Sequence, residues 1–138
     1  MRANKKPTVL VVDDEKRILD LIRIMLESEG YQVYSTESAR EAIKIASNPD
    51  AAIDLLLTDI LMPQMNGREL ANRIFSIKPF IRVLFISAYS AEILDHHKFY
   101  PDGADFIRKP FTKEELTDKI SRIMASSIYW RDLVSKQP

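Results

Sequence analysis

The chain has 138 residues, of which 46% are hydrophobic and 29% are charged, a composition typical of one folded domain and too apolar for a disordered chain. Its 20 Lys and Arg balance its 20 Asp and Glu, which argues against a dedicated nucleic-acid binder, because such proteins neutralise phosphates with excess positive charge. The absence of cysteine excludes disulfide scaffolds and zinc ribbons, and with no long apolar run and no signal-peptide pattern we expect a cytoplasmic protein without a membrane segment.

Short apolar runs alternate along the chain with segments of helical periodicity. Residues 8–13 (TVLVVD) form the first run, whose β-branched residues are typical of a buried strand. Two helices begin at capping boxes, in which Ser38 or Thr112 precedes a glutamate by three positions. In chain order, we predict strands at residues 8–13, 31–36, 53–58, 81–87 and 106–108. The helices that follow them are predicted at residues 14–29, 38–48, 67–75, 91–99 and 112–124.

Five strand–helix units in alternation predict an α/β fold, in which helices cover both faces of a parallel sheet. The first, third and fourth strands are continuously apolar, as expected of central strands, whereas the second and fifth are more polar or shorter, as expected at the edges. A doubly wound, flavodoxin-like five-stranded sheet of order 2-1-3-4-5 with five helices satisfies this pattern. We expect an N-terminal extension at residues 1–7, one domain at 8–125 and a C-terminal helix extension or tail at 126–138.

The C-terminal residues 126–138 are too apolar for a plain solvated end, because they include Ile128, Trp130, Leu133 and Val134. One interpretation is a last helix that packs a little further and then frays. The other is a docking segment or the start of a link to another domain. The sequence leaves both interpretations open.

Charged and hydroxyl side chains follow the strands at the carboxyl edge of the predicted sheet. Asp13 and Asp14 end the first strand and Asp59 follows the third, on either side of the point where the strand order reverses. Ser87 and Lys109 end the fourth and fifth strands at the same edge. Crowded carboxylates repel one another unless a cation lies among them, and Mg²⁺ prefers oxygen ligands of this kind. Together these residue types predict a site that handles phosphoryl groups.

Each of these residues alone has a more ordinary explanation. An acidic pair before a helix commonly caps it, a strand-end aspartate is common in turns, and a serine or lysine at a strand end can simply be a cap or a solvated charge. Their joint placement at one sheet edge outweighs these explanations. By contrast, His96 and His97 have no acidic or cysteine partners at metal-binding spacing, and we expect them on a helix surface.

With these residues in place, the chain resembles the receiver domains of response regulators in two-component signalling. The matching segments span about residues 7–125 and comprise 11–15 (VVDDE), 58–63 (TDILMP), Gly67, 87–88 (SA) and 109–111 (KPF). The resemblance implies the same fold and partly supports the strand order. It also implies a phosphorelay role, in which a histidine kinase or a histidine phosphotransfer domain supplies the phosphoryl group.

By resemblance, Asp59 is the phosphoacceptor, a nucleophilic carboxylate that forms an aspartyl phosphate. Asp14 and Asp59, together with the backbone carbonyl of Leu61, would bind Mg²⁺, and Asp13 would support the metal largely through bound water. Lys109 would pair with the phosphoryl group. The resemblance therefore assigns a role to every charged residue of the predicted cluster.

The resemblance also implies a switch. Ser87 would move to hydrogen-bond the phosphoryl group and Phe106 would change rotamer, altering the face formed by the fourth helix, fifth strand and fifth helix, where a downstream protein is expected to bind. Phe106 replaces the more usual tyrosine, so no switch hydroxyl is present. The expected pocket rim comprises Met62, Ala88, Tyr89 and Pro110, with a cis Lys109–Pro110 bond.

Leu61 and Tyr89 stand two positions after Asp59 and Ser87, respectively. We expect this apolar and aromatic pair to screen attacking water, which would give a slowly hydrolysing aspartyl phosphate. The simpler alternative is that both side chains only rim the pocket.

Two other functional classes compete with a signalling receiver. A haloacid-dehalogenase-type phosphatase would need a second acid two residues after Asp59, where this chain has Leu61, so we expect no enzymatic turnover beyond self-catalysed phosphorylation and slow hydrolysis. A phosphorylation-independent pseudo-receiver, acting as a protein-binding module, remains the main alternative. We expect either a stand-alone receiver or a segment of a larger regulator or hybrid histidine kinase.

Overall fold

The computed structural model describes residues 6–88 and 100–135. The predicted fourth helix at 91–99, together with Tyr89, His96 and His97, lies outside the described residues. The strands are β1 (Thr8–Val12), β2 (Gln32–Thr36), β3 (Leu55–Asp59), β4 (Arg82–Ser87) and β5 (Asp105–Arg108). The described helices are α1 (Lys16–Ser28), α2 (Ala39–Ser47), α3 (Gly67–Phe75), α5 (Lys113–Ala125) and α6 (Trp130–Val134).

All strand pairs are parallel, and the sheet has the order β2-β1-β3-β4-β5. The predicted α/β fold class and strand order are therefore confirmed. β1 lies at the centre of the strand-order reversal, because it pairs with β2 on one side and with β3 on the other. All five residues of β1 are buried, as expected of a strand covered on both faces.

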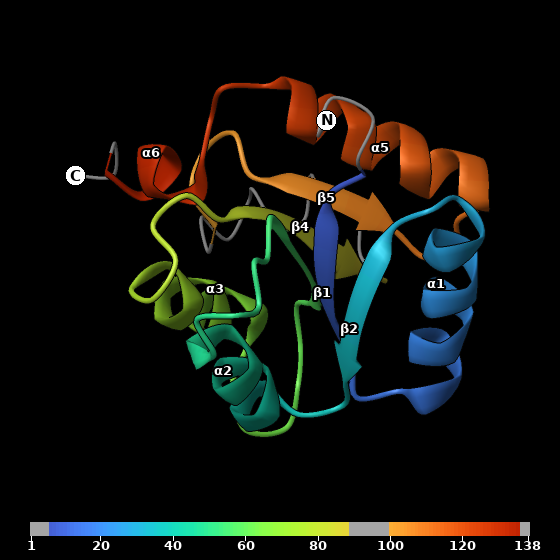
Figure 1. The fold of residues 1–138 in the computed structure, drawn as a ribbon, viewed down its shortest axis with the longest axis horizontal. Coiled ribbons are helices and arrows are strands. Elements are labelled where there is room, and N and C mark those ends of the chain that lie inside the picture. The colour runs from blue at the N-terminus through green and yellow to red at the C-terminus, as the bar shows by residue number, and fades with distance from the viewer. Residues whose placement is uncertain (1–5, 89–99, 136–138) are drawn as a thin grey trace.

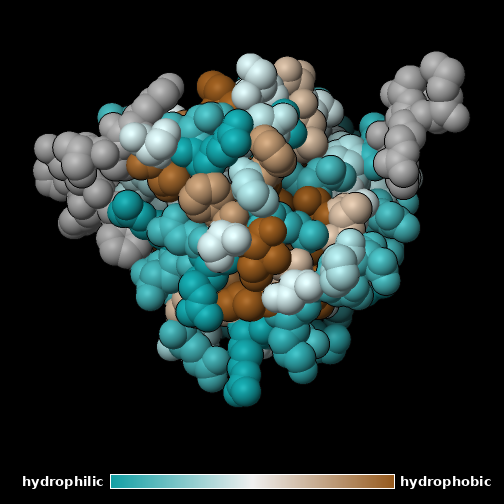
Figure 2. All heavy atoms as spheres, turned by 60° about the vertical axis from the view of Figure 1, so that its left-hand side comes forward, coloured by the Kyte–Doolittle hydropathy of each residue, from teal (hydrophilic) through white to brown (hydrophobic). Residues whose placement is uncertain are grey.

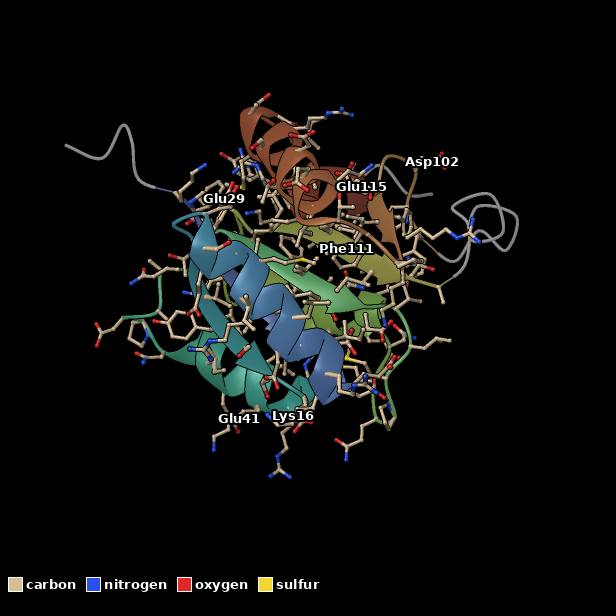
Figure 3. All side chains as sticks on the ribbon, turned by 90° about the vertical axis from the view of Figure 1, so that its right-hand side faces the viewer. Lys16, Glu29, Glu41, Asp102, Phe111 and Glu115 are labelled. Carbon is tan, nitrogen blue, oxygen red and sulfur yellow. The ribbon has the colours of Figure 1, made fainter. Side chains whose placement is uncertain are left out.

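Helices cover both faces of the sheet (Figure 1). α1 and α5 pack on one face, which Figure 3 shows from the front, and α2, α3 and α6 lie on the other. Alternate residues of β1 divide between the two cores, since Val9 and Val11 face α1 and α5 whereas Leu10 and Val12 face the opposite side. No helix in residues 6–88 and 100–135 is long and apolar enough to cross a membrane.

The capping signals have clear structural counterparts. The Ser38 side chain accepts a hydrogen bond from the backbone N–H of Glu41, and Thr112 and Glu115 form a full capping box at the start of α5. A further capping box, formed by Asn66 and Glu69, begins α3. These caps fix where each helix starts relative to the strand before it, and so help to position the loops at the carboxyl edge of the sheet.

The C-terminal segment does not simply prolong α5. α5 ends at Ala125, and the chain then turns and forms the short helix α6 on the α3 side of the sheet (Figure 1). Trp130, the first residue of α6, is only 1% exposed and belongs to the same core as Leu70 and Ile74 of α3. Residues 126–135 thus dock against the rest of the described domain.

Candidate functional site

Three aspartates meet at the carboxyl edge of the sheet. Asp13 directly follows β1, Asp14 comes next, and Asp59 is the last residue of β3. One carboxylate oxygen from each lies within 4.8 Å of the others. Asp13 is fully buried, Asp59 is half-buried and Asp14 is exposed. The strand-end placement predicted from the sequence therefore produces a real cluster of oxygen ligands.

Lys109 reaches this cluster from the end of β5. Its Nζ lies 3.4 Å from Asp13 Oδ2 and 3.6 Å from Asp59 Oδ2, and only 18% of its side chain is exposed. The Lys109 backbone N–H donates to the Ser87 carbonyl at 2.8 Å, which fixes the chain where β4 and β5 end. The following Lys109–Pro110 bond is cis, as expected. The lysine is thus held as the counter-charge of two carboxylates.

Glu15 also belongs to the cluster, although the sequence analysis predicts no role for it. Its Oε1 lies 3.3 Å from Lys109 Nζ, although most of the glutamate side chain is exposed. Its backbone N–H donates to Asp13 Oδ1 at 2.9 Å and thereby orients the buried aspartate. The only signal in the sequence is that Glu15 directly follows the two aspartates.

Burial and mutual repulsion dominate the electrostatics. Burial raises the pKa of Asp59 to about 6, and the neighbouring Asp13 carboxylate adds to the rise, while Lys109 opposes it. Burial likewise raises the pKa of Asp13. Burial alone would lower the pKa of Lys109, but the surrounding carboxylates of Asp59, Asp13 and Glu15 outweigh it and raise that pKa. The cluster therefore holds more carboxylate charge than one ammonium group neutralises.

The donor set fits a hard cation. Asp13 Oδ2 is buried and accepts no hydrogen bond from the described residues, although it pairs with the Lys109 ammonium. A buried carboxylate oxygen that accepts no hydrogen bond lowers the stability of the fold unless positive charge is nearby. Three carboxylates within reach of one point, one of them exposed to solvent, suit an ion that takes a few protein oxygens and keeps several waters.

A pocket of about 240 Å³ opens over the cluster. It is lined by Asp14, Glu15, Asp59, Ile60, Leu61, Ser87, Ala88 and Lys109. Leu61 is 59% exposed at its edge, whereas Ser87 is buried. Met62, which was also predicted for the rim, lines a separate pocket beside Asp14. Pro110 lines neither of these two pockets, and Tyr89 lies outside the described residues.

Gly67 allows α3 to begin directly against the end of β3. A Cβ at this position would lie 2.5 Å from the Asp59 carbonyl oxygen and 3.3 Å from Phe85 Cδ1. The Gly67 backbone N–H donates to the Ile60 carbonyl at 2.8 Å. Any larger residue would have to move the backbone that carries the Asp59 carboxylate, which explains glycine at this position.

Phe106 lies in β5, three residues before Lys109. Its ring centroid is 5.6 Å from that of Phe85 in β4 and 5.4 Å from that of Tyr100. In the sheet, Phe106 pairs with Phe85, two residues before Ser87. The predicted switch residue is therefore packed in an aromatic cluster with Phe85 and Tyr100.

Comparison with known proteins finds one family throughout. The family model of the response regulator receiver domain matches residues 9–121. The response regulator SaeR of Staphylococcus aureus is 33% identical over 116 residues, which cover 84% of this chain and 50% of SaeR. This chain thus spans about half the length of that relative.

Solved structures of the same family superpose closely. The response regulator TrrA from Thermotoga maritima, in complex with Mg²⁺ and BeF, has a TM-score of 0.70 at 31% identity, with 86% of this chain and 99% of that chain covered. A chain of the CheX–CheY–BeF₃–Mg²⁺ complex from Borrelia burgdorferi has a TM-score of 0.73 at 26% identity, with 86% and 90% covered. Both of these structures contain Mg²⁺ and a beryllium fluoride.

Proposed function

The chain belongs to the response regulator receiver domains of two-component signalling. From that premise, we propose that Asp59 accepts a phosphoryl group from the phosphohistidine of a histidine kinase or of a histidine phosphotransfer domain. The observation that carries the proposal is the position of the Asp59 carboxylate. It faces the pocket, with the buried Asp13 on one side and Lys109 within 3.6 Å. In this position the Asp59 carboxylate can attack a phosphoryl group in the pocket, and the Lys109 ammonium can neutralise the negative charge of the phosphorylated product.

In the proposed reaction, a carboxylate oxygen of Asp59 attacks the phosphorus atom of the phosphohistidine. A P–O bond forms while the P–N bond breaks, and the imidazole leaves with the electron pair of that bond and takes up a proton. The Lys109 ammonium neutralises the phosphoryl oxygens, and the Ser87 hydroxyl donates a hydrogen bond to one of them. Ala88 is small, and leaves the donor a path to the acceptor along the pocket wall.

We propose that Asp13, Asp14 and Asp59, with the backbone carbonyl of Leu61, hold Mg²⁺. The donor set and the buried Asp13 Oδ2 without a hydrogen bond support this assignment. When bound, the ion supplies positive charge that offsets the excess of carboxylate charge and the charge of the phosphoryl oxygens.

Phosphorylation would then be transmitted through Ser87 and Phe106 to the face formed by β5, α5 and the predicted helix at 91–99, where a downstream protein would bind. The packing of Phe106 on Phe85, two residues before Ser87 in β4, supports this route. We assign no direct nucleic-acid contact to residues 8–125, and we propose a cytoplasmic location, where a phosphohistidine donor would be formed from ATP. Leu61 at the pocket edge is in place to screen attacking water, and slow hydrolysis stays a prediction.

The first experiment is to incubate the protein with acetyl phosphate, with and without Mg²⁺, and to record its intact mass. We expect a gain of one phosphoryl group that requires Mg²⁺ and that disappears in Asp59→Asn. The matched control is Asp102→Asn, because Asp102 is an exposed aspartate at the opposite end of β5 (labelled in Figure 3) and should leave phosphorylation unchanged.

A folded wild-type protein that gains no mass would overturn the proposed acceptor role. It would favour the alternative of a phosphorylation-independent binding module. A gain that persists in Asp59→Asn would place the phosphoryl group on another residue.

A further inference from the structure

The segment 126–135, here called the C-terminal latch, is bonded to the domain through Trp130. The Trp130 backbone N–H donates to the Ile81 carbonyl at 3.0 Å, and its indole Nε1–H donates to Asn72 Oδ1 at 2.9 Å. One bond ties the latch to the amino end of β4 and the other ties it to α3. The tryptophan ring itself is buried. The latch is thus anchored at a defined place.

Stacked side chains hold the latch from the outside. The Arg82 guanidinium lies 4.4 Å from the centroid of the Tyr129 ring and donates to the Ser126 carbonyl at 2.7 Å. Arg131 lies over the Phe80 ring at 4.6 Å. Figure 2 shows this side of the molecule, where apolar side chains reach the surface among polar ones. Cation–π and hydrogen-bond contacts therefore complement the buried anchor.

Inside the domain, Trp130 joins the aromatic cluster that contains the switch residue. The Phe85 ring centroid lies 5.5 Å from that of Trp130, 4.6 Å from that of Tyr100 and 5.6 Å from that of Phe106. Phe85 is thus in contact with the latch on one side and with Phe106 on the other. A change in the position of Phe106 cannot leave the packing around Trp130 unaffected, because close-packed interiors leave little free volume.

Phe85 also lies close to the backbone of the phosphoacceptor. Thr58, the residue before Asp59, pairs with Phe85 in the sheet. A Cβ on Gly67 would lie within 3.3 Å of both the Asp59 carbonyl oxygen and the Phe85 ring, so both groups border the same small space. Phe85 therefore lies between Trp130 and two features near the acceptor: the strand residue Thr58 before Asp59, and the space beside Gly67 that the Asp59 carbonyl oxygen also borders.

We propose that docking of the C-terminal latch is coupled through Phe85 to phosphorylation of Asp59, so that the latch is a second output element of this domain. The inference rests on the proposed acceptor role. The latch is docked here while Lys109 is paired with Asp13 and Asp59. An aspartyl phosphate competes for Lys109 and carries a charge of about −2 where the carboxylate carried −1, a net change of about −1 at this edge. We expect the resulting rearrangement to reach Trp130 through Phe106 and Phe85, and to loosen the latch. By linkage, a weakened latch must in turn favour the phosphorylated arrangement.

Trp130 makes the proposal directly measurable, because it is the only tryptophan in the chain. The full chain is titrated with beryllofluoride and Mg²⁺, and site occupancy is followed by fluorine NMR. At saturation we expect a red shift of the tryptophan emission, stronger acrylamide quenching and faster hydrogen exchange at the Trp130 amide. The Asp59→Asn variant should show none of these changes.

The reciprocal arm weakens the latch from outside, with Tyr129→Ala and Arg131→Ala combined, and leaves the Trp130 anchor in place. We expect the affinity for beryllofluoride to rise about fivefold or more. The matched control is Arg40→Ala, an exposed arginine on α2, which should leave that affinity unchanged.

The outcomes separate the inference from the function on which it rests. Full occupancy with unchanged or reduced exposure of Trp130 would overturn the coupling and leave the acceptor role standing. Equal beryllofluoride affinity in the latch variant and the control would also overturn it. A protein that neither binds beryllofluoride nor gains mass from acetyl phosphate would overturn both.

Discussion

The two ends of the sheet make opposite contributions to the stability of the fold. At the carboxyl edge, Asp13 and Asp59 are held close together with raised pKa values, and one lysine faces them. At the amino end of β4, Trp130 has its backbone and indole N–H groups bonded and its ring packed among other aromatics. The carboxyl edge holds negative charge that destabilises the fold until a cation binds. The contacts of Trp130 stabilise the fold without any ligand. Mutations at the two ends should therefore shift stability in opposite directions.

The largest effect is expected for Trp130→Ala, which removes a buried ring from the aromatic cluster. We expect a loss of about 3–5 kcal/mol in the free energy of unfolding, because the cavity next to Phe85 cannot close fully. Urea denaturation followed by circular dichroism measures this loss. Ile128→Ala is the matched control, since Ile128 lies in the same segment but is 50% exposed. Equal losses in the two variants would mean that Trp130 is not a structural anchor.

A smaller loss is expected for Gly67→Ala, at the boundary between the two regions. Its Cβ would come within 2.5 Å of the Asp59 carbonyl oxygen, and relieving that overlap should cost about 1–3 kcal/mol. Because the backbone of Asp59 must shift, phosphorylation by acetyl phosphate should also slow. Arg73→Ala, on the same helix but exposed, controls for alanine in α3. Unchanged stability and phosphorylation in Gly67→Ala would contradict the close packing.

The smallest effect is expected for Asp59→Asn in the absence of Mg²⁺. It is the one substitution of the three that should increase the free energy of unfolding. Because the pKa of Asp59 is about 6 in the folded protein and 3.8 in the unfolded reference, the folded state binds its proton more tightly. The free energy of unfolding therefore falls as the pH rises from about 4 to above 6, and the full cost is present at neutral pH. Removing the charge should stabilise the protein by about 1–2 kcal/mol at pH 7.5.

The test is thermal unfolding of both proteins between pH 4.5 and 7.5. The advantage of Asp59→Asn should shrink as the pH falls, and adding Mg²⁺ at pH 7.5 should stabilise the wild type but not the variant. Asp102→Asn is the matched control, because it removes an exposed carboxylate at the opposite end of β5. A variant less stable than the wild type at pH 7.5 would mean that the Lys109 pairing outweighs the burial of Asp59.

The sequence predicted the fold because its signals are local. Alternating apolar runs and helical segments specify strands and helices one at a time, and the polar edge strands then limit the strand order. The residues of the site were equally predictable, because Asp13 and Asp14 follow β1, Asp59 ends β3, and the carboxyl ends of these neighbouring strands meet at one edge. The roles proposed for them rest on the resemblance to family motifs, which assigns the acceptor and the lysine by their positions in the chain.

Contacts between distant segments were not predictable in the same way. The Glu15–Lys109 pair joins residues 94 positions apart, and no pattern in either segment indicates it. The bond from Trp130 to Asn72 spans 58 positions, and asparagine at that place on α3 has no recognisable signature. The sequence could show that residues 126–138 are unusually apolar, but the place where they dock depends on the tertiary packing of β4 and α3.

The position of Trp130 has a consequence for the order in which a nascent chain can fold. Every strand of the sheet and the helices up to α5 are synthesised before residue 130, yet the core around Phe85 is closed only by the ring that arrives last. Until then, the growing domain exposes an aromatic surface next to α3. A chain that ended at residue 125 would retain that surface permanently, and would be prone to the self-association that exposed apolar patches cause.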